Sequence, residues 1–200
     1  MEYETFMHGL INRSFQNFVT DSYGSDVWLE VAARAGVSPP DFEAMLPYDD
    51  AVTPAVLDAI GLVLRRPRGE VMEDIGSYLV SHPKTEAVRR LLRFGGVNFE
   101  DFLHSLDDLP DRARMAVAEL QLPAIELHGH PDARYSLICD SPIDGFGHLM
   151  MGVLRVMADD YGALALLELE SSGTGRETVR IQLVQSDYAD GRDFQLGMSA

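Results

Sequence analysis

The sequence predicts an α+β fold, in which a helical N-terminal half packs on a C-terminal four-stranded antiparallel sheet of β-α-β-β order. Up to Pro123, apolar residues recur at the spacing of helices that bury one face. After Pro123, short runs that alternate apolar and polar residues replace this spacing, which is typical of strands. A chain of 200 residues with 46% hydrophobic side chains is also long and apolar enough for a sizeable core.

Local capping signals divide the helical half. Ser25 is a favourable N-cap and Gly36 a favourable C-terminal stop for one helix, and Thr53 followed by proline starts another. Asn98 caps a further helix, and the last one begins at Pro110. The expected helical spans are 3–19, 25–36, 53–64, 69–80, 85–93, 98–106 and a span that begins at 110.

The second half is expected to form four strands and one crossing helix. Alternation predicts strands near 124–128, 135–139, 163–170 and 177–184, with residues 129–132 as the turn between the first two and a helix over 147–161 between the second and third. We therefore expect one domain over residues 1–185, divided into a helical subdomain (1–120) and a sheet subdomain (121–185). A polar tail, 186–200, is expected to be loosely held.

Charge and cysteine content exclude several classes of function. Sixteen Lys and Arg against 32 Asp and Glu give a net charge of −16, which repels nucleic-acid phosphates and anionic membranes. The single cysteine, Cys139, cannot form an internal disulfide, which fits a reducing compartment. The acidic residues 1–4 do not resemble a signal peptide, and no apolar run has the length of a membrane span. The sequence therefore predicts a cytoplasmic chain that binds neither nucleic acid nor membrane.

Catalytic and metal-binding patterns are absent. The nucleophile-elbow, Walker, dinucleotide-binding and H-E-x-x-H motifs do not occur. His128 and His130 lie in the predicted turn, but no neighbouring His or Cys completes a metal site around them. The acidic pairs 107–108 and 159–160 lie near expected helix ends, where such residues face solvent. We therefore expect neither an enzyme nor a metal site.

Three segments, taken in order, carry a family resemblance. They are residues 7–13 (MHGLINR) followed by Tyr23, Gly24 and Trp28, residues 102–112 (FLHSLDDLPDR), and residues 137–145 followed by 152–154 (GVL). Together they resemble the haem-nitric oxide/oxygen binding (H-NOX) domain, a family that includes the haem domain of soluble guanylate cyclase. The resemblance runs from Met7 to about Val184 and implies the same order of helices followed by β-α-β-β.

The resemblance places Pro110 where the family has the histidine that ligates haem iron. The family pattern is approximately F-L-x-x-L-D-x-L-H-x-R, and the spacing from Leu103 to Arg112 is preserved on both sides. Proline has no side-chain donor atom and no usable nitrogen lone pair, so Pro110 cannot ligate iron. His104 and His148 are the candidate substitute ligands, and either would need local rebuilding.

The propionate-binding signature of the family, Y-x-S-x-R, appears as Cys139, Ser141 and Ile143, so only the serine is retained. Ile143 removes the arginine that pairs with a carboxylate, and Asp140 adds a negative charge beside that place. The other pocket positions that the resemblance implies are Pro123, which matches a proline pressing on the macrocycle; Leu149, where some members carry an oxygen-stabilising tyrosine; and the apolar Phe6, Leu10 and Val153.

The resemblance implies haem as cofactor and a non-catalytic gas sensor that changes the activity of a separate signalling protein, such as a kinase, a cyclase or a cyclic-dinucleotide enzyme. Two alternatives stand within this hypothesis: a haem held by a substitute ligand, or a pocket that holds another apolar ligand or nothing. The second hypothesis is a haem-free structural or protein-interaction domain whose collapsed core fills the former haem site. Nine methionines and nine phenylalanines suit a pocket and an ordinary core alike.

Overall fold

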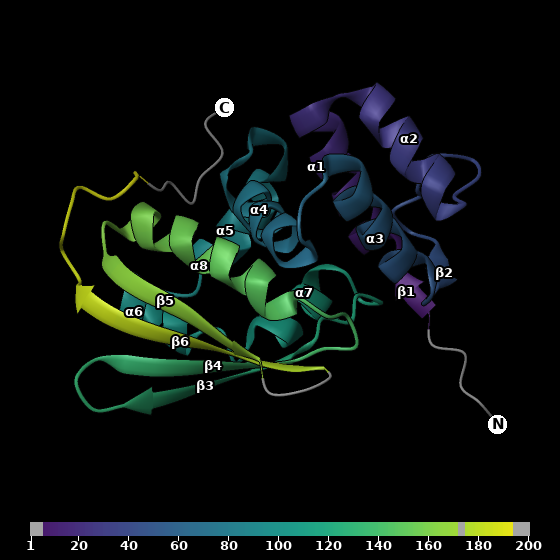
Figure 1. The fold of residues 1–200 in the computed structure, drawn as a ribbon. Coiled ribbons are helices and arrows are strands. Elements are labelled where there is room, and N and C mark those ends of the chain that lie inside the picture. Colours follow the sequence, from purple (N-terminus) through teal and green to yellow (C-terminus); the bar gives the residue numbers. More distant parts are fainter. Residues whose placement is uncertain (1–5, 172–174, 194–200) are drawn as a thin grey trace, which may run out of the picture. The chain divides into compact units, whose positions relative to one another are not determined.

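The computed structural model describes residues 6–171 and 175–193, and it confirms the predicted α+β class (Figure 1). The chain divides into two compact units: one consists of the residues up to 71 with 119–121, the other of 72–118 and the residues from 122 on. Among the described residues, no helix combines the length and the apolar character that a membrane crossing requires. The single domain over 1–185 stays a prediction.

The first unit combines helices with a small antiparallel sheet. Its elements are β1 (Phe6–His8), α1 (Gly9–Tyr23), α2 (Ser25–Ala35), β2 (Pro47–Asp49) and α3 (Val52–Leu64), and β1 pairs with β2. The expected helix over 3–19 is wrong at its start, because residues 6–8 pair with 47–49 and His8 caps α1 by accepting the Leu10 N–H at 3.2 Å. The first residues of that expected helix, 3–5, lie outside the described residues.

The capping predictions for this unit are partly confirmed. Gly36 ends α2 in the left-handed conformation, with φ 71°. Ser25 is the first residue of α2 rather than its cap, a place that Gly24 takes. Thr53 lies inside α3 rather than capping it, because its hydroxyl donates to the buried Asn12 side chain at 2.8 Å.

The helices of the second unit follow the predicted order. They are α4 (Arg68–Ser81, from Met72 on), α5 (Glu86–Arg93), α6 (Phe99–His104), α7 (Leu109–Ala116) and α8 (Phe146–Tyr161), with a short 3₁₀ turn, η1 (Pro83–Thr85), before α5. Asn98 caps α6 as predicted, since its side-chain oxygen accepts the Asp101 N–H at 2.8 Å. The local signals for these helices were therefore sufficient.

The sheet has the predicted antiparallel strands, β3 (Ala124–His130), β4 (Arg134–Asp140), β5 (Leu164–Ser171) and β6 (Arg176–Gln185), in the spatial order β3-β4-β6-β5. Helix α8 connects β4 to β5 and covers one face of the sheet (Figure 1). The predicted turn over 129–132 is wrong at its start, because β3 continues to His130, which pairs with Arg134.

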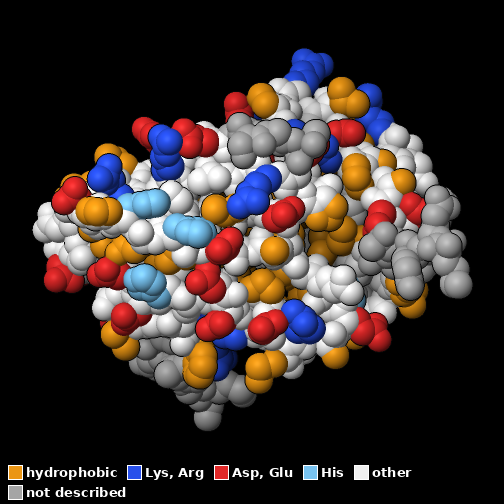
Figure 2. Space-filling model, turned by 90° about the horizontal axis from the view of Figure 1, so that it is seen from below, with side chains coloured by type: hydrophobic (Ala, Val, Ile, Leu, Met, Phe, Trp, Pro, Cys, Tyr) orange, Lys and Arg blue, Asp and Glu red, His pale blue; other side chains and the backbone are white. Residues whose placement is uncertain are grey.

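The core of the second unit lies between its helices and one face of the sheet. Tyr135, Leu137 and Cys139 alternate along β4 and are buried on that face. The molecular face in Figure 2 carries acidic, basic and histidine side chains intermixed. The period-two alternation that predicted the strands thus reflects one buried and one solvated face.

Helices α4 and α8 approach each other through their backbones at two glycines. A side-chain carbon on Gly76 would overlap the carbonyl oxygen of Leu149, and one on Gly152 would overlap the carbonyl oxygen of Glu73. Glycine in a helix interior costs about 1 kcal/mol relative to alanine, so these positions need a compensating reason. The close approach of the two helices supplies it.

Residues 188–192, part of the tail expected to be loosely held, make backbone hydrogen bonds with the end of α8. The backbone N–H groups of Tyr188 and Ala189 donate to the Gly162 carbonyl oxygen, and that of Arg192 donates to the Asp160 carbonyl oxygen. Carbonyl groups at the C-terminal end of a helix lack partners within the helix. The tail supplies those partners at the end of α8.

Candidate functional site

Pro110 is the second residue of α7 and is half-buried. Proline suits the first turn of a helix because the N–H that it lacks would have no helical partner there. The Leu109 N–H donates to the Leu106 carbonyl oxygen at 3.1 Å, and the Arg112 N–H donates to that of Asp108 at 2.9 Å. Pro110 therefore fits the start of α7 well and presents no atom that could bind a metal.

Hydrogen bonds fix the segment from α6 to α7 against its neighbours. The Arg112 guanidinium donates to the Ser105 carbonyl oxygen at 2.8 Å and to the Leu91 carbonyl oxygen at 3.2 Å. Burial lowers the pKa of Arg112. The Asp107 carboxylate accepts the Leu127 N–H at 2.6 Å. These contacts hold the segment to α5 and β3.

The two candidate substitute ligands lie on different helices. His104 is the last residue of α6 and is exposed, with its ring edge-on to Tyr135 at a centroid distance of 5.8 Å. The Tyr135 hydroxyl donates to the Glu100 carboxylate, and burial together with this bond raises the pKa of Tyr135 to about 12. His148 lies in α8 and is half-buried.

Ser141 and Ile143, which the resemblance assigned to propionate binding, are hydrogen-bonded to each other. The buried Ser141 hydroxyl accepts the Ile143 N–H and donates to the Ile143 carbonyl oxygen, each at 3.0 Å. Ser141 therefore has its hydrogen-bonding capacity used within its own turn. Ile143 is buried and apolar, and Asp140 is exposed at the end of β4. No side chain of this segment is arranged to receive a carboxylate.

Cys139 is a buried thiol with 1% of its surface exposed. Burial, reinforced by the neighbouring Glu177 carboxylate, raises the pKa of Cys139 to about 12. The thiolate is the form that reacts with electrophiles. Cys139 is therefore inert in the folded protein at neutral pH.

Thiol labelling tests this arrangement. At pH 8, a pKa of about 12 in place of 9.0 lowers the thiolate fraction of Cys139 roughly 1000-fold, and burial slows access further. Native protein should therefore react with a chromogenic disulfide at least about 100-fold more slowly than protein in denaturant. Equal rates in the two conditions would show that Cys139 is accessible.

The same shift sets a pH window for stability. The folded pKa is raised, so the contribution of Cys139 to stability is present below pH 9.0 and is lost as the pH rises toward about 12. Denaturant melts of Cys139→Ala should accordingly show a shallower loss of unfolding free energy across this window than wild type. Parallel curves would contradict the assignment.

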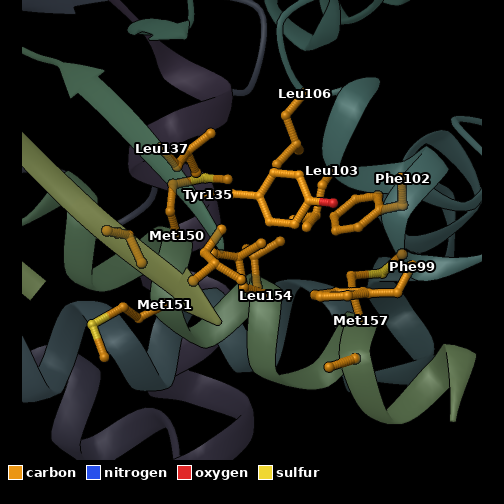
Figure 3. Packing of buried hydrophobic residues seen from close by; sticks show 14 of the residues in the cluster. Phe99, Phe102, Leu103, Leu106, Tyr135, Leu137, Met150, Met151, Leu154 and Met157 are labelled. Carbon is orange, nitrogen blue, oxygen red and sulfur yellow. The ribbon is translucent and has the colours of Figure 1, made fainter. Parts of the chain in front are cut away.

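Protein side chains fill the interior around these positions. Leu103, Leu106, Leu137 and Leu154 are each 0% exposed. Figure 3 shows side chains of α6, β4 and α8 meeting in one cluster, with Leu103, Tyr135 and Leu154 in its middle. A hollow of haem size beside these leucines would leave their surfaces accessible to water. Protein atoms cover them completely.

The remaining predicted pocket positions divide between the two units. In the second unit, Val153 is part of the buried cluster, Leu149 packs against it, and Pro123 is half-buried just before β3. In the first unit, Leu10 is half-buried in α1, and Phe6 lies in β1 with its side chain outside the described residues. The second unit therefore brings Cys139, Leu149 and Val153 to one cluster.

The residues present do not fit a haem bound in the family's manner. Such a haem needs an iron ligand, a partner for its propionates and an apolar slot. Pro110 offers no ligand atom, and the Ser141 hydroxyl is engaged with Ile143. The ligand and the carboxylate partner are therefore both missing.

Two groups that the sequence analysis set aside have defined surroundings. The prediction that the 159–160 pair faces solvent is wrong for Asp160, which is buried because its carboxylate accepts a bond from buried Arg89 at 2.5 Å. His128 lies 3.1 Å from a Glu126 carboxylate oxygen, and His130 lies 2.8 Å from the Ser136 hydroxyl. Across residues 6–171 and 175–193, no three His, Cys, Asp or Glu side chains gather as a metal site.

Sequence reasoning missed the groups that hold α6 and α7 in place. Glu100 and Tyr135 are 35 residues apart, and Asp107 and Leu127 are 20 apart, so no local window pairs them. The alternation along β4 does place Tyr135 on the buried face, where its hydroxyl needs a partner. The need of a buried tyrosine hydroxyl for a hydrogen-bond partner was the one signal in the sequence that pointed to this contact.

Comparisons with known proteins give concordant results. The model of the haem-NO-binding family matches residues 8–166. Soluble guanylate cyclase gcy-34 of Caenorhabditis elegans is 28% identical over 155 residues, which cover 76% of this chain and 23% of that protein. Soluble guanylate cyclase 89Da of Drosophila melanogaster is 22% identical over 160 residues, covering 80% and 24%. The chain thus spans only a small part of the length of these relatives.

Solved structures share the fold. An H-NOX protein from S. oneidensis in the Fe(II) ligation state superposes with a TM-score of 0.75 at 18% identity, covering 90% of this chain and 97% of that one. An unliganded Fe(II) H-NOX protein from K. algicida gives 0.75 at 14% identity, covering 94% and 100%. At these identities the structures establish the fold alone.

Proposed function

Because the chain belongs to the haem-NO-binding (H-NOX) family, whose members include haem-based gas sensors, we propose that it is a non-catalytic sensory module that works without the family's iron–histidine bond. Its output is a change in the activity of a separate signalling protein, such as a kinase, a cyclase or a cyclic-dinucleotide enzyme. The cytoplasm is the proposed location, in keeping with the single, buried, unpaired cysteine.

One observation carries the loss of coordination. Pro110 lies in the first turn of α7, a place that proline favours, and in the surrounding segment Arg112 donates to the Ser105 carbonyl oxygen while Asp107 accepts the Leu127 N–H. Proline supplies no donor atom at this position, so the start of α7 as it stands offers no ligand to iron.

A second candidate is the haem-free interaction domain with a collapsed core. The complete burial of Leu103, Leu106 and Leu154 by protein atoms favours it. The two candidates differ in whether the apolar envelope still opens for a porphyrin. Introducing the family's histidine at position 110 and its arginine at position 143 distinguishes the two candidate functions.

Hemin titration of three proteins tests both candidates. Wild type should form no specific one-to-one complex, since Pro110 and Ile143 supply neither a ligand nor a carboxylate partner. Pro110→His with Ile143→Arg should bind hemin about 100-fold more tightly than wild type and give a five-coordinate ferrous spectrum if the envelope opens. No binding by the double variant would favour the collapsed interaction domain.

The matched control is Asp111→His with Ile143→Arg, because residue 111 is the exposed neighbour of Pro110 on α7. This control should behave as wild type. If wild type already binds one hemin tightly, and His104→Ala or His148→Ala abolishes that binding, a substitute ligand exists and the proposed loss of coordination is wrong.

A further inference from the structure

The C-terminal end of α8 contains a buried ion pair. The Asp160 side chain is 4% exposed, and one of its carboxylate oxygens accepts a hydrogen bond from Arg89 Nε at 2.5 Å. The Arg89 side chain, on α5, is itself 7% exposed. Because neither charge has access to bulk water, each depends on the other, and α5 and the end of α8 are held together.

Residues 188–192, which we name the C-terminal strap, lie across this end of the helix. The N–H groups of Tyr188 and Ala189 donate to the Gly162 carbonyl oxygen at 2.8 and 3.0 Å, and the Arg192 N–H donates to the Asp160 carbonyl oxygen at 2.8 Å. Gly162 has φ 72°, and a side-chain carbon there would overlap the Ala189 carbonyl oxygen. The strap is therefore in direct backbone contact with α8.

Weak forces hold the strap in place. All its residues are exposed, so it buries no apolar side chain of its own. The Arg192 guanidinium, 59% exposed, lies 4.0 Å from Asp160 Oδ1, and exposed charges at such distances contribute little. A few backbone hydrogen bonds with no apolar anchor allow local release without unfolding of the core.

We propose that the C-terminal strap is a displaceable output element, seated on the end of α8 and released when that end shifts. The same helix carries Leu149 and Val153, and Asp160 lies 11 positions after Leu149, about 16 Å further along the helix axis. A shift of the pocket end of α8 moves the Asp160 and Gly162 carbonyl groups that hold the strap. The output role of the strap rests on the proposed sensory function, whereas its seating on α8 rests on the contacts given above.

The family match does not extend to the strap, since it ends at residue 166. Asp190 lies in the strap, and Asp187 and Asp193 lie next to its two ends. Arg93 Nη1 donates to the Asp160 carbonyl oxygen at 3.2 Å, next to the bond from Arg192.

Hydrogen exchange of the full chain, measured by NMR without any added ligand, tests the seating. The Tyr188, Ala189 and Arg192 amides of wild type should exchange at least about 10-fold more slowly than an unstructured chain. Gly162→Ala should raise their exchange about 10-fold, because the added carbon meets Ala189.

Gly36→Ala is the matched control. Gly36 ends α2 with φ 71°, so it carries the same backbone strain, but nothing lies within 4 Å of its added carbon. It should leave strap exchange unchanged. Arg192→Pro leaves the α8 sequence unchanged and removes the strap N–H that binds the Asp160 carbonyl oxygen, together with the weak side-chain contact of Arg192. It is the second variant in case Gly162→Ala misfolds, and it should also raise exchange at Tyr188 and Ala189.

The output role is tested from the far end of the helix. Leu149→Trp enlarges a partly buried pocket position and should raise strap exchange at least about 5-fold, whereas Leu166→Trp, an exposed site on β5, should not. If these amides exchange in wild type as in an unstructured chain, or if neither Gly162→Ala nor Arg192→Pro changes their exchange, the strap is not seated on α8. If Leu149→Trp leaves strap exchange unchanged, the proposed output role is wrong. Because no haem is present, these results are independent of the hemin titration.

Discussion

Replacing Gly152 by alanine is expected to lower the free energy of unfolding by about 3 kcal/mol. In an isolated helix the same change would stabilise by about 1 kcal/mol, because alanine is the better helix former. Here the added carbon would overlap the Glu73 carbonyl oxygen and lie 2.8 Å from the Ser77 nitrogen. Backbone atoms cannot rotate away as a flexible side chain would, so α8 must move from α4.

Gly76→Ala should also lower the free energy of unfolding, because its added carbon meets the backbone of Leu149 and Val153. Gly129→Ala is the control, because its nearest neighbour is the Tyr135 ring at 4.0 Å, an ordinary contact. Denaturant melts of the three variants measure the effect. A stability equal to or above that of wild type in Gly152→Ala would show that α4 and α8 do not pack this closely.

The fold was predictable wherever local signals decide it. Gly36 ends α2 because only glycine adopts a left-handed conformation without strain, and Asn98 caps α6 through its own side chain. The alternation after Pro123 predicted every strand of the sheet because one face is buried and the other is solvated. Each of these signals acts over a few residues.

The elements that were missed depend on distant partners. Residues 6–8 carry apolar side chains at a spacing that continues the pattern of α1, yet they form a strand because residues 47–49 pair with them. Backbone pairing across 40 residues leaves no trace in local periodicity. A strand as short as β2, with one residue half-buried and its neighbours exposed, shows no alternation to detect.

The positions of the candidate site stay a prediction, and their surroundings were not predictable from the sequence. The family resemblance assigned Pro110 and Ile143 to the site through the motif residues around them. The closed turn of Ser141, the packing of the leucine cluster and the hydrogen bonds of Arg112 are three-dimensional facts. They decide whether the retained envelope is open or filled.

The acidic pair 159–160 is a second case in which a distant residue decides a side chain's surroundings. Asp159 is exposed as expected, but the next residue along the helix, Asp160, turns into the protein and meets Arg89, 71 residues earlier. Composition cannot distinguish the two aspartates. Burial of one charge requires its partner, and that requirement makes the pair the most sensitive electrostatic contact to test.

Arg89→Met is expected to lower the free energy of unfolding by about 3–5 kcal/mol, because it leaves the buried Asp160 carboxylate with only the exposed Arg192 guanidinium, 4.0 Å away. The control is Arg34→Met, which breaks a 3.1 Å pair with Glu30 whose side chains are 54% and 55% exposed. That change should cost less than about 1 kcal/mol, since water solvates the charge that remains.

The double variant Arg89→Met with Asp160→Leu separates the cost of an orphaned charge from the value of the pair itself. Two apolar side chains of similar size need no desolvation of charge, so stability should return to within about 1 kcal/mol of wild type. The backbone carbonyl oxygens of Asp160 and Gly162 remain in the double variant, and the C-terminal strap should keep its exchange protection. A double variant as unstable as Arg89→Met would mean that the ion pair fixes the end of α8 by its geometry, and that apolar packing cannot replace it.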